Sequence, residues 1–83
     1  MYKLLVSFKA RREIKKLSKI NKYAILSSLS DIKEDPYLGK PLTRGQTGRF
    51  SYRMGVYRII YKINVEDEVV EILTAGYRSV VYN

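Results

Sequence analysis

The sequence predicts an α+β fold of two layers, in which a strand and a helical hairpin precede a three-stranded antiparallel meander, in the order βααβββ. Apolar residues recur at helical spacing between residues 10 and 32, whereas residues 49–75 are rich in Tyr, Ile and Val, which favour strands. The chain has 83 residues, enough for one core and too few for two domains that each fold alone. We therefore expect a single domain over residues 1–83.

The first half of the chain is expected to form one strand and two helices. Residues 2–6 are a short β-like run, and the Ser7 hydroxyl can cap a first helix. The apolar face of this helix consists of Ala10, Ile14, Leu17 and Ile20. Asn21 is expected to break the helix and cap a second one, whose apolar face consists of Ile25, Leu26, Leu29 and Ile32. Pro36 disfavours helical geometry before it, so the second helix should end near Asp35.

The first helix also carries a basic stripe on another face. Its members are Lys9, Arg12, Lys16 and Lys19. A charge run on a helix is usually its solvated side, so we interpret the stripe as electrostatic steering and not as a site.

The second half is expected to form a loop and three strands. Residues 36–48 contain two prolines and three glycines, a composition typical of a connecting loop. The strands are expected at residues 49–54, 56–63 and 69–75, separated by Met54-Gly55 and by the acidic turn at 64–68. If Met54-Gly55 is a two-residue turn, Arg53 lies opposite Val56.

Strand alternation then sorts the side chains of the hairpin onto two faces. The face that the helices should cover carries Phe50, Tyr52, Tyr57, Ile59, Tyr61 and Ile63. The other face carries Arg49, Ser51, Arg53, Arg58 and Lys62. Arginines clustered on an open sheet suit a phosphate backbone, because guanidinium groups form forked hydrogen bonds with phosphate oxygens. The same pattern also suits a merely solubilising face.

Charge and composition limit which binding partners and which catalytic chemistry the chain can have. Sixteen Lys and Arg against eight Asp and Glu give a net charge of +8, which favours nucleic acid or an acidic protein. The chain has no Cys and no His, so thiolate chemistry and histidine acid–base catalysis are excluded. Glu66-Asp67-Glu68 lacks the spacing of a calcium or magnesium loop, so no metal and no cofactor are expected. No apolar run is long enough for a membrane span, and no signal peptide is evident, so we expect a soluble cytoplasmic protein.

Several sequence blocks carry a family resemblance. Residues 49–61 read RFSYRMGVYRIIY, residues 72–78 read ILTAGYR, and residues 81–82 read VY. Together with Lys40-Pro41-Leu42 and the helical hairpin, these blocks resemble the RelE/ParE toxin superfamily. The likeness covers nearly the whole chain, and the YRIIY block is its most specific part.

The resemblance implies a compact antiparallel sheet with two helices and an acidic antitoxin that wraps the toxin. For the RelE branch it implies a metal-independent endoribonuclease, an mRNA interferase that cleaves mRNA in the ribosomal A site and so inhibits translation. For the ParE branch it implies a non-catalytic inhibitor of DNA gyrase. An inactive relative that still binds its antitoxin, or a DNA-bound repressor component, is a further alternative.

The resemblance also implies roles for individual residues. Arg53 is expected near the nucleophilic 2′-hydroxyl, Arg58 at the phosphate, and Arg78 near the leaving 5′-oxygen. Tyr82 is expected to stack on the substrate base. Further RNA-binding residues are expected to be Lys40, Arg44, Arg49, Ser51 and Tyr77.

Two positions depart from the family's pattern. Ser51 stands where the best-known RelE toxin has a lysine, and Tyr77 stands where many relatives have a histidine. A guanidinium stays protonated at neutral pH, so Arg53 is a poor general base and is expected to act by electrostatics.

Overall fold

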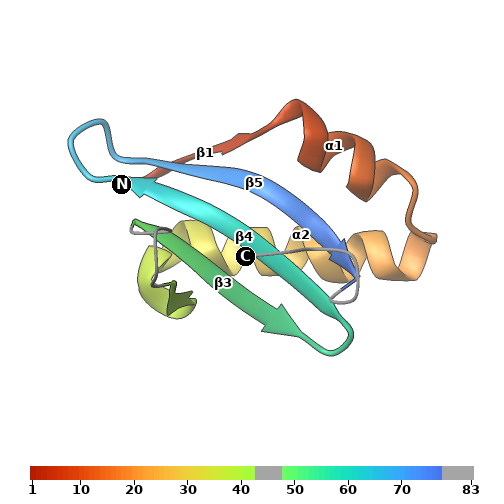
Figure 1. The fold of residues 1–83 in the computed structure, drawn as a ribbon. Coiled ribbons are helices and arrows are strands. Elements are labelled where there is room, and N and C mark those ends of the chain that lie inside the picture. Colours follow the sequence, from red (N-terminus) through yellow and green to blue (C-terminus); the bar gives the residue numbers. More distant parts are fainter. Residues whose placement is uncertain (43–47, 78–83) are drawn as a thin grey trace.

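The computed structural model describes residues 1–42 and 48–77, which form a sheet with two helices (Figure 1). The elements are β1 (Lys3–Val6), α1 (Phe8–Lys15), α2 (Lys19–Glu34), the 3-10 helix η1 (Pro36–Leu38), β2 (Lys40–Pro41), β3 (Arg49–Met54), β4 (Tyr57–Asn64) and β5 (Val69–Tyr77). This order confirms the predicted α+β fold and adds η1 and the short β2 within the predicted loop. No helix within these described residues is both long and apolar enough to cross a membrane.

The strands form one mixed sheet in the order β1-β5-β4-β3-β2. β2, β3, β4 and β5 pair antiparallel, as the predicted meander requires, whereas β1 pairs parallel with β5, with Lys3 opposite Val69. The sheet is therefore not purely antiparallel. The helical hairpin causes this, because it separates β1 from the meander and lets the last strand run beside the first in the same direction.

The helical hairpin turns earlier than the sequence predicted. Ser18 caps α2, and its side chain accepts a hydrogen bond of 3.4 Å from the Asn21 amide. Asn21 therefore lies in the first turn of α2, and the predicted break at this residue is wrong. Lys19 belongs to α2 and not to the basic stripe of the first helix, and Ile20 is 81% exposed.

The other predicted helix boundaries are confirmed. Ser7 is the N-cap of α1 and accepts a hydrogen bond of 3.1 Å from the Ala10 amide. α2 ends at Glu34, with Asp35 as its C-cap directly before Pro36.

The turn of the β3–β4 hairpin lies one residue later than predicted. Arg53 pairs with Arg58 and Met54 pairs with Tyr57, so Gly55 and Val56 form the turn. Gly55 has a φ of +58°, in the region that favours glycine. The slip moves each partner by two residues along β4, so every side chain keeps its predicted face.

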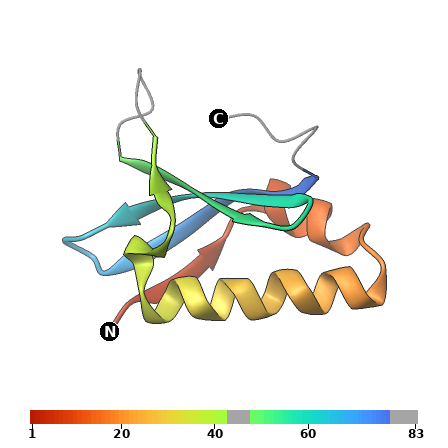
Figure 2. The same cartoon turned by 90° about the horizontal axis from the view of Figure 1, so that it is seen from below.

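The core lies between α2 and one face of the sheet, as Figure 2 shows from the side. Its buried members from the helices are Ala10, Ile14, Ile25, Leu29 and Ile32, and those from β4 and β5 are Tyr57, Ile59, Tyr61, Val70, Ile72 and Ala75. One residue of the predicted apolar face of the second helix is missing from this core. Leu26 remains 47% exposed.

Tyr61 fastens η1 and β2 to the sheet from inside the core. Its hydroxyl donates to the Pro36 carbonyl at 2.7 Å and accepts from the Gly39 amide at 2.9 Å. The ring stacks on Phe50, with the ring centroids 5.5 Å apart. Because these hydrogen bonds hold Pro36 and Gly39, which both precede β2, Tyr61 sets where the chain enters the sheet after η1.

Candidate nucleic-acid interface

The face of the sheet opposite the core collects the cations that the sequence predicted for it. We call it the arginine face and define it by Lys40, Arg49, Ser51, Arg53, Arg58 and Lys62. The pairs Lys40–Ser51, Arg49–Lys62 and Arg53–Arg58 lie directly opposite one another on adjacent strands. Residues in such pairs share a face, so the predicted sorting of these side chains is confirmed.

Three rows of residues cross this face from β3 to β5. The row at one end consists of Arg49, Lys62 and Glu71, and the central row consists of Ser51, Ile60 and Thr74. The row at the other end consists of Arg53, Arg58 and Gly76. Glu71 offsets positive charge in the first row, whereas the third row has two guanidinium groups beside a residue without a side chain. The third row is therefore the strongest position for an anion.

The Arg53–Arg58 pair lies next to the turn of the hairpin. Cβ atoms of directly opposite residues are about 4.5–5.5 Å apart, close enough for two guanidinium groups to hold one phosphate. Arg53 is exposed, whereas Arg58 is partly buried and its Nε atom is inaccessible to solvent. Such burial fixes the base of the Arg58 side chain, so its position changes little when an anion binds.

The centre of the arginine face is closed, contrary to the prediction of an open face. Ile60 is 1% exposed, and Ser51 and Thr74 beside it are also buried. A direct contact between Ser51 and RNA would need this centre to open. The accessible cations lie around the closed centre, and they are Lys40, Arg49, Arg53 and Lys62.

Glu13 is a residue of this region that sequence reasoning missed. Its carboxylate accepts hydrogen bonds from the Thr74 hydroxyl, at 2.7 and 2.8 Å, and from the Ala75 amide, at 3.1 Å. β1 pairs with β5 only as far as Ile72, so α1 supplies an acceptor where the neighbouring strand has ended. The signal in the sequence is that Glu13 is the single acid among five basic residues between positions 9 and 16.

Ser7 also makes hydrogen bonds with backbone groups along the same edge of β5. Its amide donates to the Ile72 carbonyl at 2.9 Å, and its hydroxyl donates to the Leu73 carbonyl at 2.9 Å. Ser7 and Glu13 together hold the part of β5 that leads to Gly76. The third row of the arginine face therefore rests on contacts made by α1.

Tyr77 does not lie on the arginine face. It pairs with Tyr57 on the core side of the sheet, and the two ring centroids are 4.9 Å apart. Burial raises the pKa of Tyr57, and a hydrogen bond with Tyr77 raises it further. A base that stacks on Tyr77 would therefore lie at the rim of the sheet and not over Arg53 and Arg58.

Three predicted site residues lie outside the described residues. Arg44 falls between β2 and β3, and Arg78 and Tyr82 follow β5 in the sequence. Their expected contributions stay predictions.

The acidic turn after β4 is closed by its own contacts. The Asn64 side chain donates to the Asp67 carboxylate at 3.0 Å and accepts from the Asp67 amide at 3.0 Å. In residues 1–42 and 48–77, no group of three or more Asp, Glu, His or Cys side chains has the arrangement of a metal site.

Comparison with known proteins places this architecture among toxins. Residues 4–82 match the family model described as ParE toxin of the type II toxin-antitoxin system parDE. Toxin RelG of Mycobacterium tuberculosis is 37% identical over 75 residues, which cover 88% of this chain and 86% of the relative.

Solved structures show the same fold. A chain of the RelBE2 toxin–antitoxin complex from Mycobacterium tuberculosis superposes with a TM-score of 0.86 at 35% identity, covering 93% of this chain and 98% of that one. A chain of the E. coli RelBE toxin–antitoxin complex superposes with a TM-score of 0.80 at 23% identity, covering 93% of this chain and 96% of that one.

Proposed function

The chain belongs to the RelE/ParE family of toxins from type II toxin–antitoxin systems, and from this premise we propose that it is a ribosome-dependent endonuclease that cleaves mRNA and inhibits translation. The observation that carries the proposal is the third row of the arginine face. Arg53 and Arg58 lie opposite each other there, beside Gly76, and their two guanidinium groups suit one phosphate.

The proposed reaction uses the RNA's own 2′-hydroxyl. Its oxygen forms a bond to the adjacent phosphorus while the bond from phosphorus to the 5′-oxygen breaks. The 2′-hydroxyl proton passes to water and the 5′-oxygen takes one from water, which leaves a 2′,3′-cyclic phosphate and a 5′-hydroxyl. The step needs no metal.

The chain's part in this reaction is electrostatic. Arg58 holds the scissile phosphate, and Arg53 stabilises the charge that develops around the attacking oxygen, because both remain cationic at neutral pH. Arg78 stabilises the leaving 5′-oxygen and Tyr82 stacks on the base. The ribosome positions the RNA, so modest chemical assistance from the toxin is enough.

Lys40, Arg44 and Arg49 extend the proposed RNA path from the third row, and Ser51 joins this path only when the closed centre of the face opens. Lys40 and Arg49 are exposed, so they are the described residues that contact phosphates first. Contacts of this kind add affinity without reading sequence. A ribosomal target also places the activity in the cytoplasm.

We further propose that an acidic antitoxin neutralises the chain. Two of the similar structures are toxin–antitoxin complexes, and a net charge of +8 favours a partner of opposite charge. Association should slow as salt is raised, because the charges of the two proteins steer their encounter. Stopped-flow association rates measured across a salt series test this, and rates that do not change with salt would contradict it.

Gyrase inhibition is the second candidate function. Its support is the matching family model, whose description names a ParE toxin. A gyrase inhibitor needs no arginine pair aligned on one phosphate, so the third row favours the nuclease. An inactive relative that only binds its antitoxin would show neither activity.

One experiment separates these functions. The wild type, Arg53→Ala/Arg58→Ala and the control Arg49→Ala/Lys62→Ala are induced in cells, and mRNA 5′ ends are mapped across translated frames. Both variants lose two positive charges from β3 and β4, but only the first removes the two arginines of the third row. Circular dichroism and a melting curve of each purified variant confirm that it folds.

The proposal expects cleavage locked to the reading frame in the wild type, weaker cleavage with the same frame lock in the control, because Arg49 adds only affinity, and none in Arg53→Ala/Arg58→Ala. Intact mRNA with double-strand DNA breaks would move the function to gyrase. Intact mRNA and intact DNA would leave a protein that only binds its antitoxin.

A further inference from the structure

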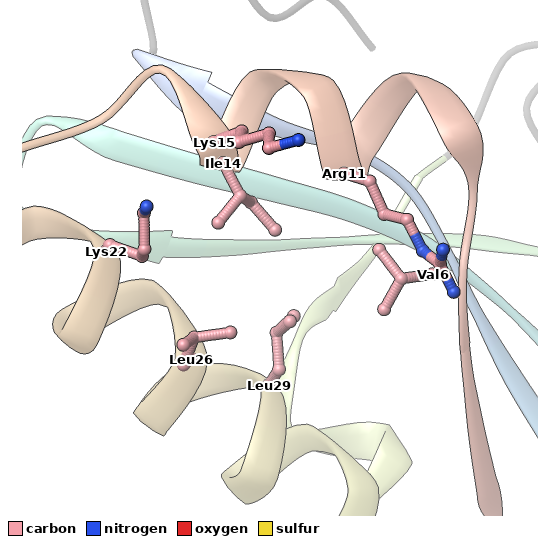
Figure 3. Close-up of a pocket in the computed structure, with 7 residues that line it drawn as sticks. All are labelled: Val6, Arg11, Ile14, Lys15, Lys22, Leu26 and Leu29. Carbon is pink, nitrogen blue, oxygen red and sulfur yellow. The ribbon is translucent and has the colours of Figure 1, made fainter.

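A pocket lies beside the β4–β5 turn, at the end of the sheet away from the β3–β4 turn (Figure 1). We call it the turn pocket and define it by Leu5, Lys62, Asn64, Asp67, Val69 and Glu71. None of these residues lines the groove between α1 and α2 that Figure 3 shows. The turn pocket is therefore a separate feature, formed by β1, β4, β5 and the turn.

The turn pocket continues the first row of the arginine face across the sheet. Leu5 in β1 lies opposite Glu71 in β5, and Glu71 lies opposite Lys62 in β4. Lys62 in turn lies opposite Arg49 in β3. Opposite residues share a face, so Leu5 and Glu71 lie on the same side of the sheet as the cations. An RNA strand that follows the cations of the arginine face therefore reaches the turn pocket.

Glu71 supplies a carboxylate without a partner at the end of this path. Its side chain is partly buried, and within residues 1–42 and 48–77 it has neither a hydrogen bond nor an ion pair. A carboxylate repels the phosphates of a bound strand, whereas it attracts N–H groups. A strand held by Arg49 and Lys62 is therefore compatible with Glu71 only where a base turns its donors toward it.

The remaining walls of the turn pocket are apolar or already satisfied. Leu5 is 55% exposed and Val69 is partly buried, and both offer apolar surface to a ring. Asn64 and Asp67 bind each other at 3.0 Å, which fixes the rim formed by the turn. An acidic protein segment fits poorly here, because Glu71 and Asp67 would repel it.

The size of the turn pocket suits a single ring system. Its volume is about 270 Å³, below the roughly 300–1,000 Å³ of pockets that hold drug-sized ligands. The step from Arg58 to Lys62 along β4 spans about 13 Å, at roughly 3.3 Å per residue. A base in the turn pocket is therefore a neighbour of the scissile phosphate and does not belong to the bond that is cut.

The four bases differ in the donors that they can offer to a carboxylate. Guanine has a ring N–H beside an exocyclic amino group, so its edge donates to both carboxylate oxygens at once. Adenine and cytosine each have an amino group beside an acceptor nitrogen, and uracil has its N–H between two carbonyl groups. Those acceptors repel a carboxylate, so Glu71 favours guanine.

We propose that the turn pocket is a subsite for an unpaired guanine base of the bound RNA. Glu71 accepts from the donor edge of the base, Leu5 and Val69 contact the ring, and Lys62 holds a neighbouring phosphate. The proposal rests on the proposed function, because it adds a base preference to the RNA path of that toxin.

The test compares two labelled single-stranded RNA oligomers that bind the full chain at low salt. Both are uridine-rich and of equal length, and the central base is guanine in one and adenine in the other. Binding is measured by fluorescence anisotropy. We expect the wild type to bind the guanine oligomer about fivefold more tightly or better, because a forked pair of hydrogen bonds discriminates bases to this degree.

Glu71→Gln tests the carboxylate while it keeps the shape of the side chain. The amide has one acceptor and one donor group in place of two acceptors, so the preference for guanine should fall to within about twofold. Loss of the negative charge raises the affinity for both oligomers, so the ratio of the two affinities is the measurement. Glu66→Gln makes the same change at an exposed position outside the turn pocket and should keep the preference.

Two further variants separate the ring contact from the phosphate contact. Lys62→Gln should weaken both oligomers alike, because phosphate contacts carry no base information. Leu5→Ala should weaken the guanine oligomer more than Val65→Ala, which shortens a side chain of similar exposure, 61% against 55%, outside the turn pocket. Circular dichroism of every variant shows whether it retains the fold.

Four results would overturn the proposal. Equal affinity of the wild type for both oligomers would show that no base is read, and so would the absence of binding to either one. A preference that persists in folded Glu71→Gln would place the reading of the base elsewhere. Free GMP that displaces the guanine oligomer as well as the unlabelled oligomer does would assign the turn pocket to a free guanine nucleotide.

The outcome stays separate from that of the proposed function. mRNA cleavage is scored in cells with the variants of the third row, whereas base preference is scored by RNA binding in solution. Cleavage without a guanine preference defeats only the subsite, and a guanine preference lost in Glu71→Gln without any cleavage defeats only the nuclease.

Discussion

The carboxylate of Glu13 in α1 accepts a hydrogen bond from the hydroxyl of Thr74 in β5, 61 residues further along the chain. The same carboxylate accepts from the Ala75 amide, which faces outward where β1 has ended. An unpaired strand edge is a site for unwanted pairing with other chains. Glu13 thus links the first helix to the strand that carries Gly76 of the third row.

Replacing Glu13 with Ala should destabilise the chain by about 1–3 kcal/mol, because it leaves two donors, the Thr74 hydroxyl and the Ala75 amide, without their acceptor. Urea unfolding measures the change, and hydrogen exchange should show faster exchange at the Ala75 amide. Glu66→Ala, in the exposed turn before β5, is the control and should change stability by no more than about 0.5 kcal/mol. Unchanged exchange at Ala75 would show that the carboxylate does not seal this edge.

Tyr61 and Gly39 should behave as one unit. Tyr61→Phe removes the hydroxyl that serves Pro36 and Gly39, and we expect a loss of about 1–3 kcal/mol. Gly39→Ala is also destabilising, because a Cβ at this position would come within 2.5 Å of the Tyr61 hydroxyl and 3.1 Å of the Ser51 carbonyl. Part of that clash disappears with the hydroxyl, so in a double-mutant cycle the double variant should be more stable than the sum of the single changes. Strict additivity would contradict this coupling.

Stability should fall at alkaline pH. Burial raises the pKa of Tyr61 and of Tyr57 above the usual tyrosine value of 10.0. Below pH 10 both tyrosines are protonated in the folded and unfolded states. Above it, the unfolded chain releases protons that the folded chain retains, so rising pH favours unfolding.

Urea unfolding at pH 9 and pH 11 measures this alkaline loss. The loss should be smaller in Tyr57→Phe than in the wild type, because one of the shifted groups is gone. Tyr23→Phe changes an exposed tyrosine on α2 and is the control. An equal alkaline loss in Tyr57→Phe and the wild type would exclude Tyr57 as a source.

The Arg53–Arg58 pair should cost stability when no anion is bound. Like charges directly opposite on adjacent strands are destabilising, and cross-strand pairs contribute roughly 0.2–1 kcal/mol. Arg53→Thr should therefore raise the free energy of unfolding by an amount in this range at low salt. Arg49→Thr is the control and should stabilise less, because Glu71 already offsets the charge of its partner Lys62.

Salt and phosphate identify the source of that difference. Added sodium chloride should reduce the gain of Arg53→Thr, since it screens exposed charges. Inorganic phosphate should stabilise the wild type more than Arg53→Thr, since ligands that bind only the folded state raise its stability. A destabilising Arg53→Thr at low salt would refute the prediction.

Local signals in the sequence predicted most of the fold. The Ser7 cap and Pro36 each act within a few residues, so the start of α1 and the end of α2 could be predicted. Asn21 was predicted to break the first helix and cap the second, whereas Ser18 caps α2; both residue types favour an N-cap, so residue type does not decide between the two positions. Gly55 fits either position of a two-residue turn, so the faces of the hairpin were predicted correctly while its register was not.

The remaining features depend on contacts between distant parts of the chain. No periodicity in residues 2–6 shows that β1 runs parallel to β5, and none shows that Glu13 reaches Thr74. The alternation that placed Arg58 on the outer face said nothing of how deeply Ile60 is buried there. Membership of one face was predictable, whereas the accessibility of that face was not.

The pairing of β1 with β5 affects when the protein can fold during its synthesis. The earliest strand to be synthesised needs a neighbour that follows it by about 66 residues, as the bond from Ser7 to Leu73 shows. The sheet thus cannot close on a nascent chain until β5 has left the ribosome. The sheet therefore forms only after the residues up to Tyr77 have been made.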